Sequence, residues 1–393
     1  MTERDEENFM TIYHMNLRMG LTAVILACLC SFSFWFTAAA CDLSREDGFP
    51  PAAAASHLHA QQQGLTFASA LAAGSNYSAT IVGAVALGAA PHGVAVMPDG
   101  RQIYVTDFNA RSVSVIDAAQ LTVIDTITVG RGAVNVILTA DGTRAYVTNE
   151  LDDTLSVIDT TTRQVIRTIP LLDRPHGMAL GVDPTTGAVD QRLYVANLGS
   201  DQVSVLNTAT LDVVIHVAVG NTPDSPLATS DGKHVWVTNY GEGEASTLSL
   251  VDTLSFTEIY TLPVGIYPHG IKFAPDGSQL YVSVQGEDKL VVVDPATRQL
   301  VATYPAGNAP HGLGISPDGG YLWTGDLVSR TSTIVDAHSG ALIGQINTGA
   351  LSNPHAIAFA PDGHRAYISD FTGRRLLVVN VMKPTSYLPV IVR

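Results

Sequence analysis

Five of the chain's twelve histidines occupy the same place in a short motif that recurs along the sequence. The motif is most often Pro-x-Gly, and its middle residue lies seven positions before the Asp of a later turn. The middle residues are His92, Val134, His176, Asp224, His269, His311 and His355. Imidazole and carboxylate groups suit Cu²⁺, Zn²⁺ and Ni²⁺. A fold that brings these positions together would therefore hold a metal ion or another ligand.

The elements that carry this motif form a repeat of about 42 residues, which is typical of a propeller or solenoid. The repeat begins at residue 91, and each copy closes on an Asp or Asn, at positions 117, 159, 207, 252, 294, 336 and 380. The first copy predicts four strands, at 93–97, 102–107, 112–117 and 122–129. A Pro-Asp-Gly turn such as 98–100 separates the first two strands, since Gly takes the left-handed position of a hairpin turn.

The strand count predicts how the ring closes. Residues 79–88 resemble a fourth strand with no first three before them, while the last repeat, 354–381, lacks a fourth strand. The N-terminal strand can complete the last blade and remove the free sheet edges. We therefore predict an all-β, seven-bladed β-propeller of four-stranded blades over residues 79–381.

In a propeller the first strand of each blade is innermost, which places the seven motif residues at one mouth of the central channel. A two-residue turn would set Asp107 beside His92, Asn197 beside His176, Asp326 beside His311 and Asp370 beside His355. Such neighbours would orient the imidazoles of a metal site. A one-residue bulge at the motif glycine would shift every partner by one. The alternative is that the histidines are structural, copied by duplication or bonded to a neighbouring polar group.

Strand motifs also show a family resemblance. Tyr146-Val147-Thr148-Asn149, Trp236-Val237-Thr238-Asn239 and the Pro-x-Gly to Pro-Asp-Gly pattern resemble the YVTN-family β-propellers of bacterial and archaeal surface proteins, which include YncE-like proteins. The resemblance covers residues 79–381 and implies a scaffold, so function must come from the site. The aromatic residue of each second strand recurs in all seven repeats and is assigned to packing between blades.

Composition excludes some functions. The formal net charge is −15, and removing residues 1–40 takes away two basic and four acidic residues, which leaves −13. A protein this acidic has no basic surface for DNA or RNA. No Gly-x-Ser-x-Gly nucleophile motif stands between a strand and a helix, which disfavours an enzyme of that kind.

The N-terminal region predicts export. Residues 21–40 form the longest apolar run, so we expect 1–40 to be a signal peptide, with a true start at Met15. Ala38-Ala39-Ala40-Cys41 resembles a lipobox, which would make Cys41 the lipid attachment site. Cleavage by ordinary signal peptidase and a retained membrane anchor are the alternatives. Residues 41–78 predict a flexible linker, and residues 382–393 a C-terminal tail.

We expect a monomeric, exported and lipid-anchored propeller at the cell envelope, periplasmic or extracellular, that meets a membrane only through its anchor. It would act as a binding scaffold for an envelope protein or a small ligand at the channel mouth. The candidate metal ligands are His92, His176, Asp224, His269, His311 and His355. A copper or zinc protein and a lactonase-type hydrolase, with ring His and Asp residues as acid and base, are the alternatives.

Overall fold

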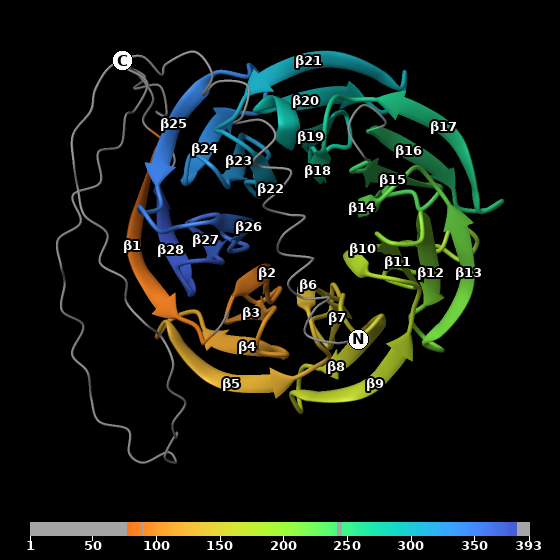
Figure 1. Ribbon diagram of the computed structural model, residues 1–393, viewed down its shortest axis with the longest axis horizontal. Helices are drawn as coiled ribbons and strands as arrows, with labels where there is room; N and C mark the ends of the chain where they lie inside the picture. The colour runs from red at the N-terminus through yellow and green to blue at the C-terminus, as the bar shows by residue number, and fades with distance from the viewer. Residues whose placement is uncertain (1–76, 89, 242–245, 383–393) are drawn as a thin grey trace, which may run out of the picture. The chain divides into compact units, whose positions relative to one another are not determined.

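A computed structural model describes residues 77–382, except 89 and 242–245. Seven antiparallel sheets of four strands are arranged around a central axis, and each sheet is one blade (Figure 1). The predicted seven-bladed propeller is confirmed. The one helical element among the described residues is the short 3₁₀ helix η3, Gln285–Glu287. None of the helical structure described here is long and apolar enough to span a membrane.

Each blade is a meander whose strands run outward from the axis. The innermost strands are β2 (Pro91–Val96), β6 (Ala133–Leu138), β10 (Pro175–Gly181), β14 (Pro223–Ala228), β18 (Pro268–Phe273), β22 (Pro310–Ile315) and β26 (Pro354–Phe359). The second strands are β3 (Gln102–Asp107), β7 (Arg144–Asn149), β11 (Arg192–Asn197), β15 (His234–Asn239), β19 (Leu280–Val284), β23 (Tyr321–Asp326) and β27 (Arg365–Asp370).

The two outer positions complete the blades. The third strands are β4 (Ser112–Asp117), β8 (Thr154–Asp159), β12 (Gln202–Asn207), β16 (Thr247–Asp252), β20 (Lys289–Asp294), β24 (Thr331–Asp336) and β28 (Arg375–Met382). The outermost strands are β5 (Thr122–Thr128), β9 (Gln164–Pro170), β13 (Asp212–Ala218), β17 (Thr257–Pro263), β21 (Gln299–Pro305), β25 (Leu342–Asn347) and β1 (Ser78–Ala86).

The ring closes as predicted, with a small shift of bounds. β1 pairs antiparallel with β28 in the sheet β1-β28-β27-β26, so the first strand of the chain completes the last blade. Every outermost strand carries a register irregularity against its neighbour. Because bulges twist an exposed strand edge away from regular pairing, they protect the rim from edge-to-edge association.

The core consists of apolar layers between neighbouring blades. Tyr104 of the first blade, for example, packs with Val136 and Val147 of the second. The recurring aromatic of the second strand is almost fully buried in all seven blades, as predicted: Tyr104, Tyr146, Tyr194, Trp236, Tyr281, Trp323 and Tyr367. These layers fix the angle between blades and therefore the positions of the inner strands.

Turn residues behave as the sequence indicates. Gly100 in the first Pro-Asp-Gly turn has a φ of 72°. The Asp that closes the first repeat, Asp117, accepts hydrogen bonds from the backbone N–H groups of Ala119 and Gln120. Equivalent Asx turns join the third and fourth strands in five other blades. The Gly, Asp and Asn residues that recur in each repeat are thus mostly residues that form turns.

Candidate functional site

The structure brings all six predicted ligands to one end of the propeller axis, at the start of the innermost strands. We call them the histidine ring: His92, His176, Asp224, His269, His311 and His355. Imidazole centroids of ring neighbours are 3.5 Å apart for His269 and His311 and 4.7 Å apart for His311 and His355. Val134, which takes the seventh position, is buried.

A bulge at the motif corrects the predicted neighbours of the ring. Pro91 is opposite Asp107, but Val94 is already opposite Val105, so one extra residue lies between them. The same shift occurs where Pro175 faces Asn197, Pro310 faces Asp326 and Pro354 faces Asp370. The pairing of His92, His176, His311 and His355 with these groups, expected for a two-residue turn, is therefore wrong, and the alternative of a one-residue bulge is what the structure has. The bulge moves each partner by one residue.

The Asp and Asn side chains expected beside the histidines form polar contacts within their own blades instead. Asp107 accepts a hydrogen bond from Ser114, and Asn197 donates one to Ser204. Asp326 accepts hydrogen bonds from Thr331 and Thr333 of the adjacent strand. Asp370 binds the guanidinium of Arg375 at 2.8 Å. These four groups fasten the second strand to the third, and none of them forms a direct hydrogen bond to an imidazole of the ring.

A different device holds the ring residues, one that the sequence analysis missed. A Thr or Ser hydroxyl on the second strand accepts a hydrogen bond from the backbone N–H of the residue after the motif position in its own blade. The same hydroxyl donates a hydrogen bond to the backbone carbonyl of the residue at the motif position in the next blade. The donors are Thr106 to Val134, Thr148 to His176, Thr238 to His269, Ser283 to His311 and Ser369 to His92. The signal was present as the third letter of the Tyr-Val-Thr-Asn motif.

The motif glycine allows the blades to approach. A Cβ on Gly312 would lie 1.8 Å from the carbonyl oxygen of His355, and one on Gly177 would lie 2.2 Å from that of Asp224. Both distances are shorter than any real contact, so a larger residue would push neighbouring ring residues apart. Glycine thus keeps the ring tight enough for side chains of adjacent blades to share a ligand.

Half of the ring is a set of neutral imidazoles. Burial, followed by the effect of neighbouring imidazoles, lowers the pKa values of His92 and His311 well below the usual range. Burial is also the main reason that the pKa of His355 falls to about 4. Neutral imidazoles have the free lone pair that metal binding requires. His355 Nδ1 lies 3.1 Å from the carbonyl oxygen of Asn353, which orients its ring.

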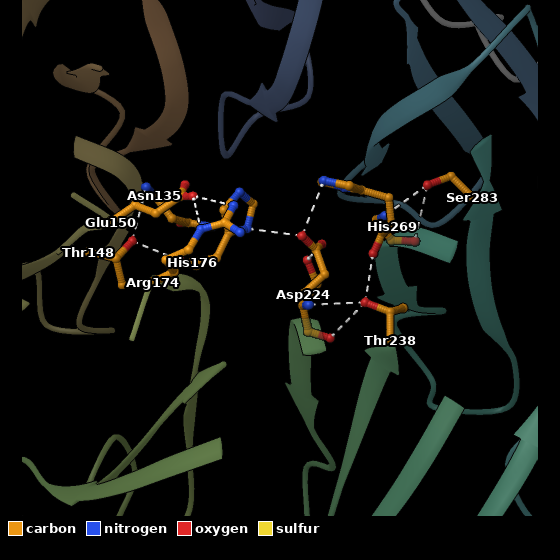
Figure 2. Close-up of polar contacts among 11 residues, drawn as sticks. Asn135, Thr148, Glu150, Arg174, His176, Asp224, Thr238, His269 and Ser283 are labelled. Atoms are coloured by element: carbon orange, nitrogen blue, oxygen red, sulfur yellow. Dashed lines mark hydrogen bonds and ion pairs between the residues drawn. The ribbon is translucent and has the colours of Figure 1, made fainter. Parts of the chain in front are cut away.

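The other half is organised by Asp224, which is 3 % exposed (Figure 2). Its Oδ1 lies 3.0 Å from His176 Nδ1 and 3.4 Å from His269 Nε2. Burial opposes ionisation of Asp224, but the imidazoles of His269 and His176 outweigh it and lower the pKa of the carboxyl to about 2. Burial likewise opposes the charged form of His176, yet Asp224 raises the pKa of that imidazole. Burial lowers the pKa of His269.

Aromatic residues surround part of the ring, another feature that the sequence analysis did not select. The ring centroid of Phe371 is 4.8 Å from that of His355, and Phe108 is 6.3 Å from Phe371. Tyr240 stacks on Tyr267 at 4.6 Å and meets His269 edge-on. Phe108, Tyr240 and Phe371 each follow the last residue of a second strand, so their shared register could have identified them.

On the His176 side, the ring borders a charged pair instead. Arg174 donates two hydrogen bonds to Oε1 of Glu150, which is buried, at 3.0 and 2.8 Å (Figure 2). The surroundings of the ring are therefore aromatic near blades one and seven and between blades four and five, and charged near blade three. Such asymmetry would favour one orientation of a bound organic group.

The predictions for residues 1–40 and most of 41–78, the Cys41 lipid site and the tail beyond Met382 lie outside the described residues. They stay predictions.

The fold and the ring define a seven-bladed β-propeller with a cluster of imidazole and carboxylate side chains at one end of its axis. Residues 74–186 match the family model of the YNCE-like beta-propeller, and residues 180–359 match that of the 7-bladed beta-propeller Lactonase. These matches confirm the resemblance to YVTN-family propellers that the strand motifs predicted. The search of curated proteins found no match to this chain.

Solved structures confirm the architecture only. Hydrazine synthase of Kuenenia stuttgartiensis is similar with a TM-score of 0.66 and 20% sequence identity, covering 74% of this chain and 95% of that one. In all, 1691 solved chains match, and a fold shared so widely does not select a function. The function has to be argued from the ring.

Proposed function

We propose that this protein is an exported binding propeller whose axial histidine ring holds a transition-metal ion, Cu²⁺ or Zn²⁺. The observation that supports the proposal is that the ligand atoms of the ring side chains lie close together. His92, His311 and His355 each offer a ligand atom within 4.8 Å of the others, and so do His176, Asp224 and His269. Imidazole nitrogen with one carboxylate is the donor set that Zn²⁺ and Cu²⁺ prefer.

Burial and charge support metal over a purely structural role. Neutral imidazoles buried side by side gain little from one another, and His269 Nδ1 is buried without a hydrogen-bond partner. An unpaired buried nitrogen costs free energy that a ligand would offset. The formal charge of −15 also attracts cations rather than polyanions. We further propose that Cys41 carries a lipid and that the propeller works at the cell envelope.

The test is metal binding by the intact protein and by a His269→Val, His311→Val variant. Valine is the chosen replacement because Val134 occupies the equivalent place in the second blade. We expect Zn²⁺ or Cu²⁺ to bind the protein in calorimetry and to be lost from the variant. A His338→Ala, His364→Ala variant, altered at two exposed histidines away from the ring, is the control. Less than about one-tenth of an equivalent bound to the intact protein would contradict the proposal.

A lactonase-type hydrolase is the second candidate. The match to the lactonase model spans residues 180–359, which include Asp224, His269, His311 and His355. The contact of Asp224 with His176 and His269 resembles the way a carboxylate orients a general base. A screen of lactone substrates tests this candidate, with the His269→Val, His311→Val variant as the control. Turnover no faster than in buffer would argue against it.

A scaffold for an envelope protein is compatible with the same site. Pull-down from envelope extracts, with and without added Zn²⁺, would show whether a partner depends on the ring. Enrichment of the same proteins on an unrelated propeller would argue against a specific partner.

A further inference from the structure

The ring divides into two groups, each from three consecutive blades. The first, which we call the three-histidine arc, contains His311, His355 and His92 from blades six, seven and one. The second, the Asp224 arc, contains His176, Asp224 and His269 from blades three, four and five. The second blade, with Val134, offers no ligand and separates the arcs on one side.

The three-histidine arc has the dimensions of a single metal site. Its imidazole centroids are 4.7, 4.7 and 5.8 Å apart. With metal–nitrogen bonds of about 2.1 Å and tetrahedral angles, three imidazoles around one ion place their centroids about 5 Å apart. Its three members therefore surround one ion with small adjustments of side-chain torsion.

The Asp224 arc also has the dimensions of one site, with a different donor set. Asp224 Oδ1 is 3.0 Å from His176 Nδ1 and 3.4 Å from His269 Nε2. Adjacent donor atoms in a tetrahedral metal site lie about 3.4 Å apart. His176 and His269 have their imidazole centroids 5.9 Å apart, on either side of the carboxylate (Figure 2).

The boundary between His269 and His311 argues against one shared ion. The imidazoles of His269 and His311 are only 3.5 Å apart between centroids, with planes at 35°. That separation is too short for two ligands of one tetrahedral ion, whose centroids need about 5 Å. At the other boundary, His92 and His176 are 5.8 Å apart, the same separation as His92 and His311 within one arc, so the arcs are divided there only by the second blade, where Val134 offers no ligand. The donor atoms of each arc therefore converge on a separate point.

We propose that the ring holds two transition-metal ions, one in the three-histidine arc and one in the Asp224 arc. This inference rests on the proposed function and adds the number and the ligands of the ions. The first arc supplies three neutral nitrogens, while the second supplies two nitrogens and one carboxylate oxygen. Each ion has three protein ligands, which leaves a position for water or a substrate. The inequivalent donor sets give the two ions different spectra and affinities.

The experiment uses single substitutions that disable one arc each. The variants are Asp224→Val and His355→Val, with valine chosen again because Val134 occupies the equivalent place, and the protein that carries both. Zn²⁺ is titrated by calorimetry and measured by elemental analysis after dialysis. We expect two equivalents in the unaltered protein, one in each single variant and none in the double variant. Cu²⁺ paramagnetic resonance supplies a second reading, with three nitrogen couplings in Asp224→Val and two in His355→Val.

Each alternative outcome is decisive. One equivalent in the unaltered protein would overturn the two-ion proposal while the proposed function stands, and no equivalents would overturn both. Two equivalents that leave together in either single variant would overturn the separate ligand sets. If a valine variant does not fold, Asp224→Leu and His355→Leu, which keep a larger apolar volume, replace it. Circular dichroism of the metal-free variants identifies that case.

Discussion

Asp326 is a carboxyl group in a place where three other blades use an amide. It is fully buried, and it accepts hydrogen bonds from Thr324, Thr331 and Thr333. At the corresponding place in the second blade, Asn149 donates to Thr154 and Ser156. Burial is the main reason that the pKa of Asp326 rises to about 6, and the threonine hydrogen bonds only partly oppose it. At neutral pH the blade therefore contains a buried carboxylate that forms no ion pair with any of the residues described by the structure.

We predict that Asp326→Asn raises the free energy of unfolding by about 1–3 kcal/mol at pH 7.5. The folded-state pKa of about 6 exceeds the usual value of 3.8, so the folded protein keeps a proton that the unfolded chain releases. The contribution of Asp326 to stability therefore falls as pH rises from about 4 to 6, and the advantage of the variant over the unaltered protein appears in that window. Urea unfolding of the variant and of the unaltered protein at pH 7.5 and pH 4 measures the difference in their free energies of unfolding at each pH.

Asp370→Asn is the matched control, because Asp370 has a cation partner in Arg375. Removing that charge should lower stability at pH 7.5 rather than raise it. If Asp326→Asn destabilises the protein at pH 7.5 as much as Asp370→Asn does, the assignment of an unpaired buried carboxylate to Asp326 is wrong.

At the residue scale the sequence predicted which ring side chains meet but not what surrounds them. The repeat register alone placed His92, His311 and His355 together. The assumption of a two-residue turn then placed Asp107 beside His92, although Asp107 is opposite Pro91. The motif glycine made a one-residue bulge the alternative, but the repeat pattern could not decide between the two registers. Phe371 and Glu150 directly follow a second strand, and they were missed because the residue type at this shared position differs from blade to blade.

Among the elements, the second strand determines the position of the first. Thr148 accepts a hydrogen bond from the backbone N–H of Asn135 and donates one to the carbonyl of His176 in the next blade. One hydroxyl thus ties two inner strands together at the ring. Because both partners are backbone groups, its loss would leave two polar atoms unpaired in a buried place.

We predict that Thr148→Val lowers the free energy of unfolding by about 1–3 kcal/mol. It should also weaken metal binding, since the backbone of His176 loses its anchor. Thr148→Ser is the control, because Ser283 and Ser369 do the same work in their own blades. Chemical unfolding and Zn²⁺ titration of both variants measure the two effects. Equal losses for valine and serine would show that the methyl group, and not the hydroxyl, matters.

Strand positions were predictable because turn chemistry repeats. The expected segments 102–107 and 112–117 coincide with β3 and β4, and 122–129 differs from β5 by one residue. Pro-Asp-Gly turns and Asx turns fix these bounds locally. The irregularity in each outermost strand was not foreseen, since it depends on the twist of a strand edge and not on a residue type.

For the molecule as a whole, closure depends on one strand from the far end of the sequence. β1 pairs with β28, and side chains next to or within it enter two layers between blades. Tyr77 and Ala79 pack with Trp323 between blades six and seven, and Trp323 Nε1 donates to the Tyr77 hydroxyl at 3.0 Å. Val85 and Leu87 pack between blades seven and one. The strand was predictable because a fourth strand was missing from the last repeat.

We predict that a chain lacking residues 1–88 melts about 10 °C or more below a chain lacking only residues 1–63. Without β1, the edge of β28 is left unpaired and the apolar groups that β1 covers meet water. A synthetic peptide of residues 77–88 should restore part of the lost melting temperature, because pairing with β28 needs no covalent link. The same melting temperature for both chains, with no response to the peptide, would mean that packing between blades closes the propeller unaided.

Metal binding at the histidine ring gives a second measure of closure, because His92 and His355 lie on either side of this junction. If closure positions the three-histidine arc, the shorter chain should lose the metal ion proposed for that arc and regain it with the peptide.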